Sequence, residues 1–245
     1  MATNVLRIAV ITDTHGNLPA LRAALEAIGR AGCDAIFHTG DAIGIGPAPA
    51  ECVELLLATP HTHCLLGNHE GWLLNGLPDP SPVWMSGWVA EHLEWTWDQI
   101  RPPLRSAIAG WSHVTNRRFA GLAATFLHYA RDSSGKEFLR TPDEPTAHDM
   151  ELIFGSRRGG IVFFGHDHLR RDIRGRMRYV NPGALGCHDD AVARYCLADF
   201  AGGRCRVRFR GAEYSDDELR RLFEERKVPQ RRRIYATFFP GRLAG

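Results

Sequence analysis

The first third of the chain alternates apolar runs with amphipathic ones. Residues 5–12 are almost all apolar or β-branched, which predicts a buried strand. Residues 18–30 carry leucine and isoleucine at helical spacing, and Gly32 follows as a helix stop. The same alternation predicts a strand, a helix and a strand at residues 35–38, 50–58 and 62–66. This βαβαβ order favours a sheet that is at least partly parallel and has helices packed on it.

Residues 78–103 interrupt this rhythm. Prolines at positions 78, 80 and 82 predict a loop. Four of the six tryptophans follow in one helical stretch that ends before Pro102-Pro103, at positions 84, 88, 95 and 97. The simpler interpretation is an amphipathic helix packed on the main body. The alternative is a cap over a functional site whose rings stack on a substrate base.

The rest of the chain is richer in strands. They are predicted at residues 121–128, 160–164, 177–180, 194–200 and 204–209. Ala201-Gly202-Gly203 predicts a hairpin between the last two, and a capping box at residues 215–218 opens a terminal helix. Without a repeat or an obvious linker, residues 1–245 are predicted to form a single domain with a Trp-rich helical insertion at about 78–103.

Composition and charge narrow the class of protein. Hydrophobic residues make up 44% of the 245 residues and charged residues 24%, as in ordinary globular proteins. A net charge of +2 indicates no specific nucleic-acid partner, and the arginine clusters at 170–178, 204–210 and 231–233 are interpreted as solvated surface. No apolar stretch approaches the ~20 residues of a membrane span.

The six cysteines form no C-x-x-C pair, so neither a zinc ribbon nor a thioredoxin-type site is indicated. They are interpreted as buried thiols of a reducing compartment. The first residues lack the features of a signal peptide, so we expect a cytoplasmic protein. The sequence does not specify its oligomeric state.

Four blocks share one design, in which an apolar strand is followed at once by Asp, His, Asn or Gly. They are TDTHGN at 12–17, TGD at 39–41, LGNHE at 66–70 and FGHDH at 164–168, with a weaker fifth, FLH, at 126–128. Ligands of open α/β sheets bind outside the carboxyl ends of the strands, so these blocks predict a site at one sheet edge. The candidate metal ligands are Asp13, His15, Asp41, Asn68, His128, His166 and His168.

The ligand types predict the metal and the chemistry. Imidazole and carboxylate without thiolate suit divalent Mn, Fe, Zn, Co or Ni. Asp13 and His15 stand at i and i+2, so on an extended segment both would reach one ion, and His166 and His168 repeat this spacing. Seven ligands exceed one tetrahedral site, whereas two ions about 3.5–4 Å apart would use them all. Such a pair would bind a phosphate and acidify a bridging water, whose hydroxide would attack phosphorus.

The blocks D-x-H, G-D, G-N-H-E, a lone His and G-H-x-H resemble, in this order, those of the calcineurin-like metallophosphoesterases, from residue 8 to about 186. The nearest resemblance is to the small prokaryotic phosphodiesterase branch. It implies an α/β (α+β) fold, a four-layer α/β/β/α sandwich of two mixed β-sheets flanked by helices. It also implies one ion on Asp13, His15, Asp41 and His168, and a second on Asp41, Asn68, His128 and His166. His69 matches the histidine that binds no metal, contacts substrate and assists the leaving group.

The chain departs from the family pattern in places. Tyr129 stands where similar prokaryotic members of the family have a small residue, so we expect the space for substrate to differ there. Gly44-Ile45-Gly46 replaces the Asp and Arg of protein phosphatases, which removes a partner for His69 and a phosphate-binding group. Among neighbours of the blocks, His38 is expected to support a ligand, Glu70 and Asp167 to orient histidines or face solvent, and Asn181 to close a turn.

Three functional hypotheses follow. The first is a phosphodiesterase acting on a small or nucleotide-like phosphate ester. The second is a phosphomonoesterase, which includes a protein phosphatase or a dinucleoside polyphosphate hydrolase. The third is a non-catalytic scaffold that binds proteins, and the retained His69 argues against it.

Overall fold

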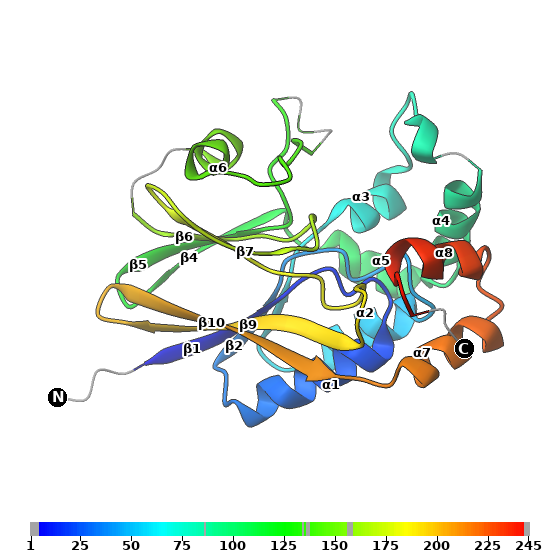
Figure 1. The fold of residues 1–245 in the computed structure, drawn as a ribbon, viewed down its shortest axis with the longest axis horizontal. Helices are drawn as coiled ribbons and strands as arrows, with labels where there is room; N and C mark the ends of the chain where they lie inside the picture. Colours follow the sequence, from blue (N-terminus) through cyan, green and yellow to red (C-terminus); the bar gives the residue numbers. More distant parts are fainter. Residues whose placement is uncertain (1–4, 86, 134, 136–137, 156–158, 243–245) are drawn as a thin grey trace.

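Two five-stranded sheets form the centre of the molecule in the computed structural model, which describes residues 5–85, 87–133, 135, 138–155 and 159–242 (Figure 1). The first sheet has the order β10-β9-β1-β2-β3. Its strands are β1 (Leu6–Ile11), β2 (Ala35–His38), β3 (Thr62–Cys64), β9 (Val192–Ala201) and β10 (Arg204–Glu213). Strands β1, β2 and β3 are parallel, whereas β9 runs antiparallel to both β1 and β10. The sheet is therefore mixed, as predicted.

The second sheet is also mixed and has the order β4-β5-β6-β8-β7. Its strands are β4 (Val114–Phe119), β5 (Leu122–Leu127), β6 (Ile161–Phe163), β7 (Arg170–Arg174) and β8 (Arg178–Pro182). The three inner strands are parallel, and each outer strand is antiparallel to its neighbour. Both sheets thus contribute parallel strands whose carboxyl ends can share one edge of the molecule.

The inner faces of the two sheets pack against each other through aromatic side chains. Phe37 of β2 stacks on Phe126 of β5 with 3.9 Å between ring centroids, and Phe126 stacks on Phe163 of β6 at 5.2 Å. Ile8 and Val10 of β1 are fully buried in the same cluster. This core holds the carboxyl ends of strands from both sheets in a fixed relation.

Helices cover the outer faces. Helices α1 (Leu18–Arg30), α2 (Pro49–Ala58) and α5 (Pro102–Ala109) pack in one cluster with the first sheet, and α6 (Ala147–Phe154) packs on the second through Met150. Asn17 caps α1 by accepting a hydrogen bond from the N–H of Ala20 at 3.1 Å. The four-layer arrangement confirms the predicted fold class.

The Trp-rich segment packs on the main body. It forms a short 3₁₀ helix (Val83–Met85) and α4 (Trp88–Asp98). Trp97 contacts the outer core of the first sheet, while Trp88 and Trp95 contact a cluster built by α7 (Asp216–Glu225) and α8 (Arg231–Phe238). The simpler interpretation of the segment agrees with this packing. Among the helices in the described ranges, none has the length and apolar character needed to cross a bilayer.

Candidate metal centre

The polar blocks lie where parallel strands end. Asp13 and His15 follow β1, Asp41 follows β2, and Asn68 begins α3 (Asn68–Asn75) shortly after β3. From the second sheet, His128 follows β5, and the pair at 166 and 168 follows β6. The structure thus brings together residues from five strands of two sheets. That they ligate metal stays a prediction.

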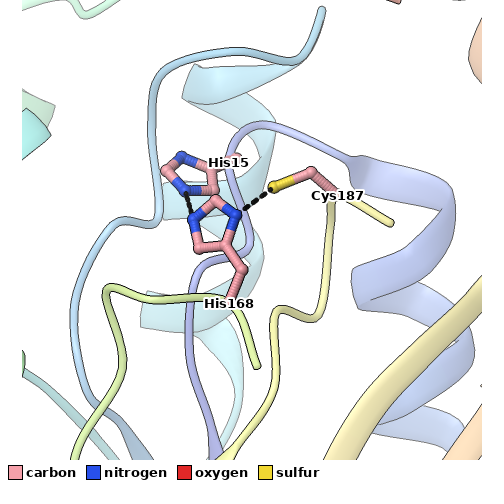
Figure 2. A group of neighbouring side chains, drawn as sticks. All are labelled: His15, His168 and Cys187. Carbon is pink, nitrogen blue, oxygen red and sulfur yellow. Dashed lines mark hydrogen bonds between the residues drawn. The ribbon is translucent and has the colours of Figure 1, made fainter. Parts of the chain in front are cut away.

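One group of side chains surrounds the end of β1. The Nε2 atoms of His15 and His168 lie 3.0 Å apart (Figure 2). Asp13 Oδ1 is 3.7 Å from His15 Nε2 and 3.5 Å from His168 Nε2. Asp13 and His15 are almost fully buried, so their polar atoms have little access to bulk water. Two imidazole nitrogens and a carboxylate oxygen therefore converge on one point.

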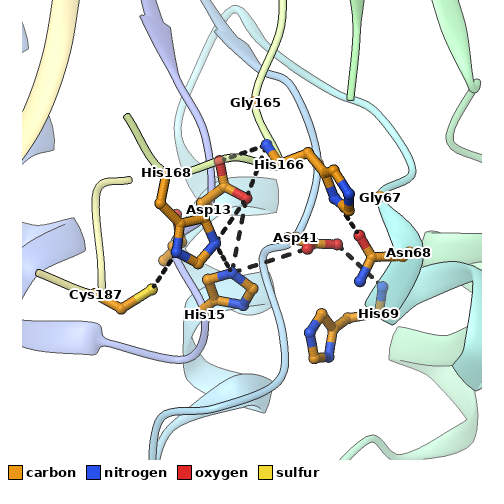
Figure 3. A network of polar contacts seen from close by, with 12 residues as sticks. Asp13, His15, Asp41, Gly67, Asn68, His69, Gly165, His166, His168 and Cys187 are labelled. Carbon is orange, nitrogen blue, oxygen red and sulfur yellow. Dashed lines mark hydrogen bonds and ion pairs between the residues drawn. The ribbon is translucent and has the colours of Figure 1, made fainter. Parts of the chain in front are cut away.

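A second group surrounds Asn68. Its Oδ1 atom is 3.0 Å from His166 Nδ1 (Figure 3). The same atom is 3.0 Å from His128 Nε2. The rings of the two histidines are nearly perpendicular, with centroids 5.2 Å apart. An amide oxygen and two imidazole nitrogens thus face a second point.

Asp41 lies between the two groups. Its Oδ2 atom is 3.8 Å from His15 Nε2 in the first group and 3.3 Å from His128 Nε2 in the second. Its Oδ1 atom accepts a hydrogen bond from the backbone N–H of His69 at 3.0 Å. This is the position that a shared carboxylate needs.

The backbone at these residues is left-handed, so the expected extended geometry is wrong. The φ angles are 53° at Asp13, 49° at His15, 57° at Asp41, 76° at His166 and 60° at His168. A non-glycine residue in this conformation costs roughly 1–2 kcal/mol. The two histidines at 166 and 168 consequently face different groups rather than one. The backbone strain is concentrated at the site, as is common where side chains are held for function.

Glu70 holds the loop that carries Asp41. It is fully buried, and its carboxylate accepts hydrogen bonds from the backbone N–H groups of Asp41, Ala42, Ile43 and Gly67, at 2.7–3.2 Å. The expectation that Glu70 faces solvent or orients a histidine is therefore wrong. Its side chain instead orients backbone, joining the loop after β2 to the start of α3.

Two further neighbours of the blocks behave as expected. His38 Nδ1 accepts a hydrogen bond from the N–H of Gly40 at 3.2 Å, so its Nε2–H donates to the hydroxyl of Thr14 at 2.9 Å. Thr14 stands between two predicted ligands, so His38 supports them from behind. Asn181 closes a turn by accepting from the N–H of Gly183 at 2.9 Å, and it also donates to Asp167.

The electrostatics of the centre favour cations. Burial lowers the pKa of His15 and of His168, and it lowers that of His166 to about 3, so these imidazoles are neutral and present lone pairs. Burial raises the pKa of Asp13, whereas nearby histidines, led by His128, outweigh burial and hold that of Asp41 well below its usual range. The charge of Asp41 in turn outweighs burial and raises the pKa of His128 to about 9, so this imidazole is protonated when no metal ion is bound. Two buried carboxylates repel each other unless a positive charge lies between them, which His128 supplies in part and a bound cation would supply more fully.

The outer nitrogens of two histidines show the same arrangement. His15 Nδ1 lies 3.2 Å from the carbonyl of Ile43, and His128 Nδ1 lies 3.0 Å from that of Thr39. A carbonyl accepts only, so Nδ1 carries a proton in both histidines. Nε2 of His15 therefore points its lone pair inward, and Nε2 of His128 would do so once a metal ion displaces its second proton. Metal-ligating histidines are usually held in this way. The residues present therefore fit divalent metal ions.

His69 lies at the rim of the centre. Its ring is perpendicular to that of His15, with centroids 5.0 Å apart, and it contacts Trp72 edge-on at 4.8 Å. A Cβ atom on Gly44 would lie 2.2 Å from His69 Nδ1, so the glycine makes room for the ring. The loop that lacks the Asp and Arg of protein phosphatases thus packs directly against His69.

The sequence pattern that defines the family described as "Calcineurin-like phosphoesterase" matches residues 6–185, about three quarters of the chain. The chain belongs to this family. It is therefore a hydrolase acting on phosphate esters, and its family implies divalent metal ions at the centre described above. The resemblance found in the sequence is confirmed.

Three proteins similar to this phosphoesterase share most of its length. An uncharacterised protein of Methanocaldococcus jannaschii is 28% identical over 218 residues, which cover 78% of this chain and 82% of the relative. The crystal structure of a metallophosphoesterase from Sphaerobacter thermophilus is 25% identical, with a TM-score of 0.70, and the match covers 95% of this chain and 99% of that one. A hypothetical protein of Pyrococcus horikoshii is 19% identical with a TM-score of 0.79, covering 96% and 99% of the two chains, and shows the shared fold.

Two residues beside the centre have contacts that the sequence did not predict. Tyr129 is only 3% exposed and lies 5.2 Å from the ring of His166, so in this phosphoesterase it packs behind a predicted ligand. Cys187, predicted only as a buried thiol, contacts His168. The signal that would have found it is its place: it too follows the carboxyl end of a parallel strand, β8.

Proposed function

We propose that this phosphoesterase is a two-metal phosphodiesterase acting on a small or nucleotide-like ester. The observation that carries the proposal is the position of Asp41, whose Oδ2 atom lies within 3.8 Å of histidines from both groups. One ion would be held by Asp13, His15, Asp41 and His168, and the other by Asp41, Asn68, His128 and His166. When bound, such ions neutralise charge on the phosphate oxygens and acidify water.

His69 would assist the leaving group. Burial lowers the pKa of its imidazole, and the charge of Asp41 opposes this by favouring the protonated form. Its backbone N–H is tied to Asp41 and its ring stands beside that of His15, so it lies next to the predicted ions. A protonated imidazole in this position would donate a proton to the departing alkoxide.

The charge of the substrate favours a diester. A phosphate monoester carries a charge of about −1.5 to −2 near pH 7, whereas a diester carries a single negative charge. Gly44-Ile45-Gly46 supplies no guanidinium at the position where protein phosphatases have one. The site therefore has fewer positive groups to bind the extra negative charge of a monoester. The competing hypothesis is phosphomonoesterase or dinucleoside polyphosphate hydrolase activity.

Turnover of paired chromogenic substrates tests the proposal. With Mn²⁺ added, kcat/KM for bis(p-nitrophenyl) phosphate should exceed that for p-nitrophenyl phosphate by about tenfold or more, which corresponds to ~1.4 kcal/mol in the transition state. A preference for the monoester would support the competing hypothesis. Binding of metal without hydrolysis of either compound, or of a set of nucleotide diesters, would favour the non-catalytic scaffold.

A further inference from the structure

The loop after β8 is attached to the segments that carry the predicted ligands by backbone hydrogen bonds. The N–H of Ala184 donates to the carbonyl of His168 at 3.1 Å, and the N–H of Gly186 donates to that of Asp13 at 2.9 Å. A Cβ atom on Gly186 would lie 1.8 Å from the carbonyl oxygen of Thr14, so only glycine permits this approach. The next residue, Cys187, is therefore held firmly beside the first group of predicted ligands.

The thiol of Cys187 contacts one nitrogen of the His168 ring while the other nitrogen faces the centre. Cys187 Sγ lies 3.5 Å from His168 Nδ1, and the cysteine is only 3% exposed (Figure 2). His168 Nε2 lies 3.0 Å from His15 Nε2 (Figure 3). The ring thus connects the sulfur to the position of the predicted first ion.

This sulfur stands where two of the other predicted ligand histidines, His15 and His128, have a carbonyl oxygen. The outer nitrogens of His15 and His128 are held by backbone carbonyls, as described above. Their side chains are 2% and 1% exposed, whereas that of His168 is 27% exposed. With less packing around it, the orientation and tautomer of His168 depend more on the one partner of its outer nitrogen.

We propose that Cys187 is a positioning residue of the metal centre. Its sulfur accepts a hydrogen bond from the Nδ1–H of His168, and this keeps the Nε2 lone pair directed at the first ion. The inference rests on the proposed function, because it requires that His168 bind metal. The competing role, in which Sγ itself ligates the ion, is an outcome of the test, since the ligand atoms of His15, His168 and Cys187 all lie within 4.8 Å of one another.

Metal titration of the purified full chain tests the proposal. The variants are Cys187→Ala and Cys187→Ser, and the matched control is Cys196→Ala, which removes a fully buried thiol from the core between the sheets. We expect Cys187→Ala to weaken binding of one Zn²⁺ about 10–100-fold in a chelator competition, as loss of an outer partner does. Cys187→Ser should recover part of that affinity, and Cys196→Ala should leave it unchanged.

The spectrum of the Co²⁺-loaded protein separates positioning from ligation. Wild-type protein should show the visible bands of nitrogen and oxygen ligation without a sulfur-to-cobalt charge-transfer band in the near ultraviolet. Such a band in wild type and its loss in Cys187→Ala would overturn the positioning role, and so would unchanged Zn²⁺ affinity in both variants at position 187. Wild-type protein that binds no divalent metal would instead refute the proposed function itself.

Discussion

Asp41 Oδ2 lies 3.3 Å from His128 Nε2, and this contact joins the loop after β2 of the first sheet to the end of β5 in the second. If Asp41 is shared between ions, Asp41→Asn removes a negative charge and one oxygen ligand from both. We expect metal content to fall from two ions per chain to fewer than one, measured by mass spectrometry of the dialysed protein.

The control for this variant is Asp199→Asn, which removes a partly buried carboxylate that pairs with Arg7 and Arg208, away from the metal centre. It should keep the wild-type metal content. Retention of two ions per chain by Asp41→Asn would show that this carboxylate is not shared.

Substitution of His69 should separate metal binding from turnover. His69→Asn leaves every predicted ligand in place but removes the acid that would protonate the leaving group. We expect unchanged metal content and a kcat lowered at least ~100-fold, the scale of a lost acid–base group. Wild-type kcat in this variant would take His69 out of the mechanism.

Gly44 provides an independent way to disturb the same histidine. A Cβ at Gly44 would lie 2.2 Å from His69 Nδ1, whereas a Cβ at Gly76 would meet nothing within 4 Å, although both glycines have positive φ, +89° and +80°. Gly44→Ala and Gly76→Ala should each add backbone strain, on the order of 1–3 kcal/mol, because both positions have positive φ. Only Gly44→Ala should lower kcat, by about 100-fold, because it displaces a reacting group.

Steady-state kinetics and urea unfolding of these two alanine variants decide the point. Equal loss of kcat in both would assign the effect to general destabilisation rather than to the position of His69.

Glu70→Gln should destabilise the protein. The carboxylate accepts four backbone N–H groups, and the amide of glutamine would turn its NH₂ group toward some of them. We expect a loss of about 3 kcal/mol in the free energy of unfolding, measured by urea denaturation. Glu151→Gln is the control, because Glu151 accepts from the N–H of Arg176 at a more exposed position. If Glu70→Gln lowers the free energy of unfolding no more than Glu151→Gln does, Glu70 does not hold the loop after β2 to the start of α3.

Asp172 should contribute stability that depends on pH. Arg178 donates to both of its carboxylate oxygens at 2.7 Å and to the carbonyl of Cys205 at 3.0 Å, which links the second sheet to β10 of the first. These hydrogen bonds, the leading cause, lower the pKa of Asp172. A lowered folded pKa means that the stabilisation is present above the unfolded pKa of ~3.9 and is lost as pH falls through the folded value.

We therefore expect Asp172→Asn to lose about 0.5–1 kcal/mol at pH 7, a modest value because the pair is partly exposed. The difference from wild type should be smaller at a pH below the unfolded pKa of ~3.9 and should shrink toward zero as pH falls through the lower folded value. Urea unfolding at both pH values checks this, and a difference that stays the same in acid would exclude the ion pair as its source.

The sequence predicts the fold best where an apolar strand ends in a polar block. Strands β1, β2, β5 and β6 and helix α1 could all be located in this way. Strands β4 and β7 were not predicted, because they are edge strands with sequences VTNRRF and RRDIR that carry no apolar run. Helix α5 was not predicted either, because Pro102 ends one helical stretch yet also begins the next, where its missing N–H costs nothing.

At the candidate site, the residue types could be predicted from the sequence, whereas their backbone conformation could not. Aspartate and histidine at strand ends identify Asp13, His15 and Asp41 as candidate ligands. Nothing in the local amino-acid sequence predicts that all three have a left-handed φ angle. That conformation depends on distant contacts, such as the bond from the N–H of Gly186 to the carbonyl of Asp13. The roles of Glu70 and Cys187 depend on such tertiary contacts in the same way.

The division of the predicted ligands between two sheets has a consequence for assembly. Asp13 and Asn68 come from the first sheet, while His128 and His168 come from the second, so a chain with only one sheet folded holds an incomplete set. Metal would then bind late in folding, after the two sheets have packed together, and would link the two sheets. Each bound ion would add RT ln(1 + [M]/Kd) to the free energy of unfolding, where [M] is the concentration of free metal ion. The stability of the protein would therefore rise with the concentration of metal in the cell.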